Sequence, residues 1–179
     1  MKLIRLLLVA VFALGASGCT NLFFQPSSRI YADPADLGLR YEVIKFQSGD
    51  GTELTGMFFA STAPAPHFET QQLTDGFQSA GPALGTIVHL HGNAQNMTSH
   101  FPNSSWLARE GFNVFIFDYR GYGASKGKPE LDGIIQDAVA ALRQVRKIPG
   151  VDADRIAVFG QSLGGAIGIA AIARSGLPQ

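Results

Sequence analysis

The stretch Gly160-Gln161-Ser162-Leu163-Gly164 lies between two elements that the sequence predicts with opposite patterns. Residues 155–159 form a short apolar run typical of a buried strand, and residues 165–174 are small, apolar and long enough for a helix. At such a turn, small residues let the backbone adopt a strained conformation that lifts the serine hydroxyl into solvent. With 21 glycines in the chain the pattern alone is not specific, so its position carries the prediction that Ser162 is a nucleophile.

An alternation of strands and helices leads up to this turn. Residues 86–90 and 113–118 are apolar on both faces, as expected of parallel strands covered by helices on both sides. Residues 131–147 carry apolar side chains at helical spacing. The sequence therefore predicts a doubly wound α/β domain with a mostly parallel sheet.

The domain begins with a predicted antiparallel hairpin. Residues 41–47 and 54–60 are separated by Ser48-Gly49-Asp50-Gly51, which has strong turn chemistry. Residues 61–85 are rich in Pro, Gly, Ser, Thr and Gln, and predict a long surface loop. We therefore expect the α/β domain to cover residues 40–179.

The N-terminus has the pattern of a signal peptide over residues 1–18, with a basic start and an apolar stretch too short to span a bilayer. Gly15-Ala16-Ser17-Gly18-Cys19 resembles the lipobox of bacterial lipoproteins, although Ala16 departs from the usual leucine. This resemblance implies that Cys19 is acylated, and that residues 19–39 tether the domain to a membrane. Thr20 favours the outer membrane of the cell envelope by resemblance to the lipoprotein sorting rule. An ordinary secretory signal, giving a periplasmic or secreted protein, is the alternative.

Composition excludes one class of partner and leaves others open. The formal net charge is +0, and Lys and Arg do not cluster into a basic face, so nucleic-acid binding is not expected. The single cysteine cannot form an intramolecular disulfide. The oligomeric state is not legible from the sequence.

Three motifs in order connect this chain to a known family. His91-Gly92-Asn93 follows one predicted strand, Asp118 to Ser125 follows the next, and the turn at Ser162 follows the third. In this order and spacing the chain resembles the N-terminal half of an α/β-hydrolase of the esterase and serine-aminopeptidase-like lineage. The similarity covers about residues 41–179 and includes Gly160 and Gly164 of the nucleophile elbow.

This resemblance implies roles for individual residues. The oxyanion hole would use the backbone N–H groups of Leu163 and of Asn93, with Ala94 as the adjacent alternative. His91 would support the oxyanion loop, and Gly92 would let its backbone approach closely. The expected activity is hydrolysis of a small-molecule or peptide ester, thioester or amide through a Ser162 acyl-enzyme, without a cofactor.

The other histidines have simpler interpretations. His89 alternates with His91 along its strand and is expected to be a hydrogen-bonded, buried or half-buried side chain. His67 and His100 are expected to be solvated. A metal site formed by His89, His91 and His100 lacks a carboxylate at helical spacing, so no metal is predicted.

The glycines between Asp118 and Ser125 do not have the spacing of a phosphate-binding loop. The family resemblance implies a structural turn there, in which Asp118 and Arg120 bond neighbouring loops.

The residues that would complete a catalytic triad are absent. After Ser162 the sequence has no His, Asp or Glu, and its only charged residue is Arg174. Family order places the acid and then the histidine after the serine, so we expect a truncated or interrupted gene and an inactive chain. The alternative is a non-catalytic envelope lipoprotein that uses a remnant hydrolase fold as a binding or structural module.

Overall fold

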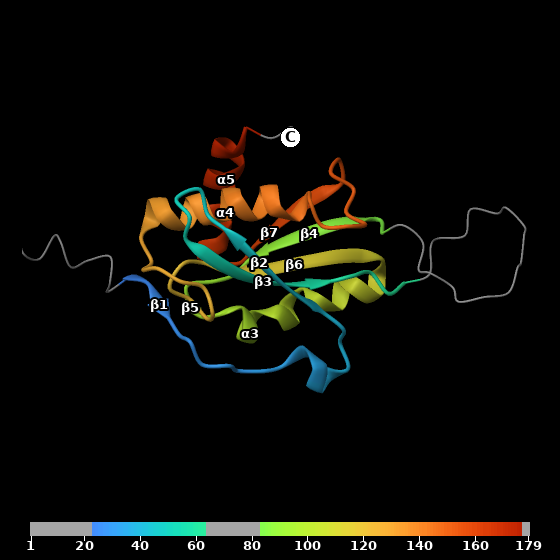
Figure 1. Ribbon diagram of the computed structural model, residues 1–179. Helices are drawn as coiled ribbons and strands as arrows, with labels where there is room; N and C mark the ends of the chain where they lie inside the picture. Colours follow the sequence, from blue (N-terminus) through green and yellow to red (C-terminus); the bar gives the residue numbers. More distant parts are fainter. Residues whose placement is uncertain (1–22, 64–82, 177–179) are drawn as a thin grey trace, which may run out of the picture.

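A five-stranded sheet lies at the centre of the computed structural model, which describes residues 23–63 and 83–176 (Figure 1). The proposed signal peptide, Cys19, His67 and most of the predicted loop 61–85 lie outside the described residues. The strands are β2 (Glu42–Gln47), β3 (Glu53–Phe59), β4 (Gly85–Leu90), β6 (Phe112–Asp118) and β7 (Ile156–Gly160), in the spatial order β2-β3-β6-β4-β7.

The strand directions confirm the predicted fold class. Strands β2 and β3 form the antiparallel hairpin, and β4 pairs in parallel with both β6 and β7. The carboxyl ends of β4 and β7 therefore meet at one edge of the sheet. This register places the loop after Leu90 beside the turn after Gly160, because these two residues are paired in the ladder.

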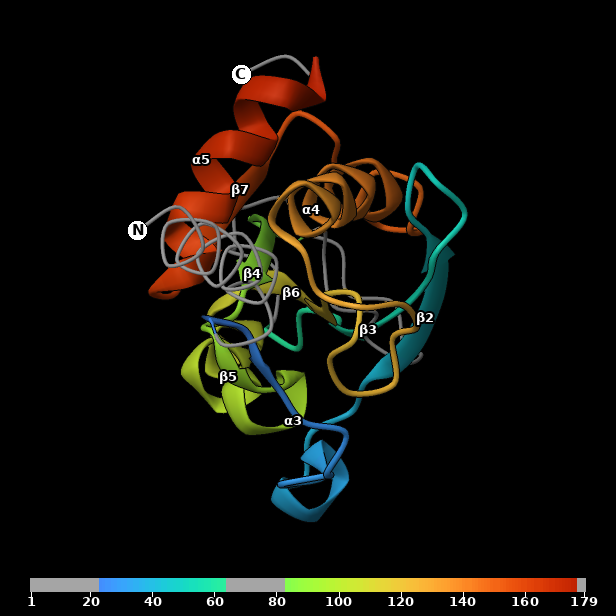
Figure 2. The same ribbon diagram turned by 90° about the vertical axis from the view of Figure 1, so that its left-hand side faces the viewer.

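Helices cover both faces of the sheet (Figures 1 and 2). Helices α4 (Leu131–Val145) and α5 (Leu163–Ser175) pack on one face, and their apolar sides join the larger hydrophobic cluster. The other face is covered by α3 (Met97–His100) and two short 3-10 helices, η2 (Phe101–Asn103) and η3 (Ser105–Glu110). The sequence analysis did not predict η2 and η3.

Strand β7 forms one edge of the sheet. Among the described residues it pairs only with β4, and Phe159 on it is 40% exposed although the strand is apolar on both faces. On the neighbouring helix α5, Ile169 is 75% exposed. The predicted strand and helix are thus present, with part of their apolar surface open to solvent.

The segment from Phe23 to Leu39, which the sequence assigned to a tether, lies against the domain. It contains β1 (Gln25–Pro26), which pairs in parallel with β5 (Ala94–Gln95), and the 3-10 helix η1 (Pro34–Leu37). Phe24 is buried in the larger cluster. Within the described residues, no helix is long and apolar enough to cross a membrane.

Candidate active site

Ser162 occupies the turn between β7 and α5 and is exposed. Its φ of 52° and ψ of −115° make it one of two non-glycine residues with positive φ in the described part of the chain. Such backbone conformations cost free energy and cluster at functional sites. The turn is held by backbone hydrogen bonds from Gln161 N to Leu90 O and from Gly165 N to Ser162 O, each 2.9 Å long.

Gly160 and Gly164 leave room for this turn to close. A Cβ on Gly160 would lie 2.5 Å from Gly165 Cα. A Cβ on Gly164 would overlap the carbonyl oxygen of Leu90 and lie 2.8 Å from that of His91. Both positions therefore require glycine because backbone atoms occupy the space of a side chain.

The loop after β4 lies directly beside Ser162. A Cβ placed on Gly92 would be 3.9 Å from Ser162 Cβ and 3.7 Å from Gln161 O. This loop is the one that the sequence predicts as half of an oxyanion hole. The structure thus brings Gly92 and Ser162 together across 70 residues of sequence.

The Asn93 side chain is fully engaged in fixing this loop. Its Nδ2 donates to Phe23 O at 2.6 Å, and its Oδ1 accepts from Gln25 N at 3.3 Å and from Tyr122 Oη at 2.9 Å. These bonds leave the amide side chain unavailable to a substrate. The expected donors, the backbone N–H groups of Leu163 and of Asn93 or Ala94, remain a prediction.

His91 is buried inside the loop. Its Nδ1 donates to Gly92 O at 2.7 Å, and its ring lies 4.4 Å from that of Tyr119 and 5.3 Å from that of His100, measured between ring centroids. Burial lowers the pKa of His91 from 6.5 to about 3, so the ring is neutral at pH 7. With no exposed surface, this ring cannot reach a substrate as a general base.

Asp118 lies behind His91 and ties the loop to the end of β6. Its Oδ1 accepts from Met97 N at 2.6 Å and lies 3.5 Å from His91 Nε2. Burial raises the pKa of Asp118 from 3.8 to about 7. A carboxyl that is partly protonated near neutrality avoids placing a full charge beside the neutral imidazole.

The prediction that His100 is solvated is wrong. His100 is half-buried, with Nδ1 3.0 Å from Gln161 Oε1 and Nε2 2.9 Å from Ala94 O. It therefore links the loop after β4 to the residue that precedes Ser162. Sequence reasoning missed this link because Gln161 lies 61 residues away.

His89 is buried, as expected, and only one of its ring nitrogens has a hydrogen-bond partner. Its Nδ1 lies 2.8 Å from Ser104 Oγ, its Nε2 has no partner, and its ring packs 4.8 Å from that of Phe159 between centroids. Burial lowers the pKa of His89 from 6.5 to about 4. Within the described residues, no group of three or more His, Cys, Asp or Glu side chains could hold a metal ion.

Arg120 joins three segments through its guanidinium. It bonds Asp137 on α4 at 2.8 Å, Asp50 in the hairpin turn at 2.8 Å and Ser48 Oγ at 3.2 Å. Arg120 is 5% and Asp137 0% exposed. These contacts make the segment after β6 a structural turn.

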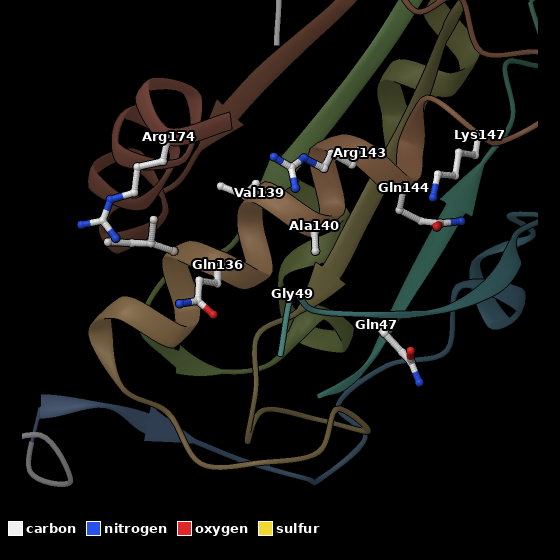
Figure 3. A pocket seen from close by; sticks show the side chains of 10 residues that line it. Gln47, Gly49, Gln136, Val139, Ala140, Arg143, Gln144, Lys147 and Arg174 are labelled. Atoms are coloured by element: carbon white, nitrogen blue, oxygen red, sulfur yellow. The ribbon is translucent and has the colours of Figure 1, made fainter. Parts of the chain in front are cut away.

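A cavity of about 460 Å³ opens between α4, the β2–β3 turn and the end of α5 (Figure 3). Arg143, Lys147 and Arg174 contribute cations to its wall, and Gln47, Gln136 and Gln144 contribute amides. None of its lining residues belongs to the loop after β4 or to the turn at Ser162. The cavity is therefore separate from the candidate active site.

The profile of the serine aminopeptidase S33 family matches residues 81–177, a range that contains both the loop after β4 and the Ser162 turn. The chain belongs to the α/β-hydrolase superfamily. The hydrolase is 42% identical to the protein YfhR of Escherichia coli K12, over 82% of this chain and 45% of YfhR. It is 38% identical to the α/β-hydrolase domain-containing protein WAV2 of Arabidopsis thaliana, over 75% of this chain and 39% of WAV2.

A solved structure supports the same fold. The Pyrococcus furiosus esterase Pf2001 superposes with a TM-score of 0.65 at 22% identity, covering 87% of this chain and 53% of that chain. The hydrolase spans about half the length of the curated relatives that it matches.

Proposed function

We propose that Ser162 is the nucleophile of a serine hydrolase that cleaves an ester, thioester or amide through an acyl-enzyme. The observation that supports this most is an exposed serine at positive φ, packed against the loop that starts at His91. In the reaction, Ser162 Oγ bonds to the substrate carbonyl carbon, and the oxygen gains negative charge. The N–H groups of Leu163 and of Asn93 or Ala94 would stabilise this oxyanion.

The serine proton must pass to a base before the alcohol, thiol or amine leaves and water releases the acyl group. Three histidines lie in the described residues near Ser162, and none is suited to this role. His89 and His91 are buried and neutral, and His100 has both ring nitrogens engaged. We therefore assign the base and its orienting acid to residues that the printed sequence does not contain.

The chain ending at Gln179 should hydrolyse short-chain p-nitrophenyl esters no faster than its Ser162→Ala variant. Without a base the serine hydroxyl keeps its high pKa, and loss of a triad member costs several orders of magnitude in rate. Initial rates of the two purified proteins, compared at equal concentration, measure this. A clear Ser162-dependent rate would show that a histidine within this chain acts as the base.

A chimera tests the nucleophile itself. We would join this chain to the part of Escherichia coli YfhR that follows the matched region, and expose the product to a fluorophosphonate probe. Labelling at Ser162 that is absent from the Ser162→Ala chimera supports the hydrolase. A folded chimera that takes no label favours the non-catalytic lipoprotein module.

We further propose that Cys19 is acylated and anchors the protein in the bacterial cell envelope, with the outer membrane favoured. Labelled palmitate should enter the mature protein in growing cells, and Cys19→Ala should abolish the label. Autoradiography of the immunoprecipitated protein provides the measurement. Label retained by the Cys19→Ala protein would contradict the assignment, and an unlabelled soluble protein would support a secretory signal instead.

A further inference from the structure

The segment 23–39, here called the strap, is fixed to the domain through its backbone. Asn96 Nδ2 donates to the carbonyl oxygens of Ser27 and Arg29 at 2.7 Å each. Gly123 N donates to Ser27 O at 3.0 Å, and Tyr31 N donates to Thr98 Oγ1 at 3.0 Å. Together with the β1–β5 pairing, these bonds hold the strap in place along the side of the molecule that carries α3 (Figures 1 and 2).

The strap nevertheless exposes four large apolar side chains within 15 residues. Phe23 is 56%, Ile30 74%, Tyr31 37% and Leu37 55% exposed. Exposed apolar residues scattered singly need no explanation, but a group carried by one fixed segment marks an interaction surface. Because the strap backbone is bonded to the domain, these side chains are held outward.

The chain before the strap indicates what covers this surface. Only residues 20–22 separate Phe23 from Cys19, so an extended chain places the two at most ~14 Å apart. If acyl chains hold Cys19 at a bilayer, Phe23 must lie at or close to the headgroup region. The Arg29 guanidinium lies 5.5 Å from the Tyr31 ring centroid, an amphipathic pair suited to a membrane interface.

We propose that the strap is a membrane-contact surface, in which Phe23, Ile30, Tyr31 and Leu37 insert into the headgroup region of a lipid bilayer. The inference rests on the proposed acylation for its choice of partner, but not on catalysis at Ser162. The charges of residues 23–40, Arg29, Arg40, Asp33 and Asp36, sum to zero. Attraction to the bilayer is therefore hydrophobic and independent of anionic lipid.

The test uses the chain without its first 19 residues, which retains every described residue and has no acyl chain. It should float with vesicles of uncharged phosphatidylcholine in a density gradient, equally at about 0.1 M and about 1 M salt. A triple variant, Phe23→Ser with Ile30→Ser and Leu37→Ser, should lower the partition coefficient at least about tenfold. Aggregated protein sediments, so flotation separates it from bound protein.

A second triple variant provides a matched control. Val43→Ser, Leu131→Ser and Ile169→Ser remove side chains that are 56%, 53% and 75% exposed on other elements. This variant should float like the unmodified chain, and so should Ser162→Ala, which separates this test from that of the hydrolase.

Equal flotation of the two triple variants would overturn the proposal. So would a strap whose substitution abolishes dimers in solution without changing flotation, since the surface would then bind a second copy of the chain.

Discussion

Gly164→Ala is expected to unfold the protein or to destabilise it by more than about 4 kcal/mol. The new Cβ would overlap Leu90 O and approach His91 O to 2.8 Å, and neither backbone oxygen can move without disturbing the end of β4. Whole domains are stable by only about 5 to 15 kcal/mol, so such a loss removes most of the folded population. Urea unfolding followed by circular dichroism measures the effect.

Gly165→Ala is the matched control one residue later in the same helix. Its Cβ would lie 3.6 Å from Gly160 O, an ordinary van der Waals contact. Alanine also favours a helix over glycine by about 1 kcal/mol, so stability should be unchanged or slightly higher. If both variants unfold at the same urea concentration, the close packing of the elbow on β4 is incorrect.

Arg120→Ala is expected to cost about 3 to 5 kcal/mol of unfolding free energy, because it leaves the buried Asp137 carboxylate without its charged partner. The Arg120 side chain makes three hydrogen bonds to Asp137, from Nε to both carboxylate oxygens and from Nη2 to one of them. Lysine should not restore stability, since a single ammonium cannot reproduce the forked geometry.

An exposed ion pair supplies the comparison for Arg120. Arg155 bonds Asp152 at 2.7 Å, but their side chains are 53% and 41% exposed. Arg155→Ala should therefore cost less than about 1 kcal/mol. Equal losses for the two arginine variants would show that burial does not determine the strength of the Arg120 network.

Much of the fold could be predicted because long periodic patterns identify their own elements. Strands β4 and β6 were predicted from apolar residues on both faces, and α4 from its helical spacing. The turn at Ser162 was found because its glycines occur between a strand and a helix. In each case the information lies within a window of some 15 residues.

The missed features depend on partners that are distant in sequence. Strands β1 and β5 have two residues each and exist only because they pair with each other across 69 positions. The contacts of His100 arise in the same way, from a residue that the fold brings close. Proline and glycine in the strap suggested a tether, since no local pattern reports a backbone bonded to another loop.

The bond between Asn93 and Phe23 O joins the loop beside Ser162 to the segment that follows Cys19. A hydrolase anchored through that segment would have its reactive serine held at a fixed height above one leaflet. Encounters with a membrane-borne substrate would then occur in two dimensions, and the rate would follow the surface density of that substrate and not its bulk concentration. Lengthening the chain between Cys19 and Phe23 would raise the serine away from the leaflet and leave its chemistry unchanged.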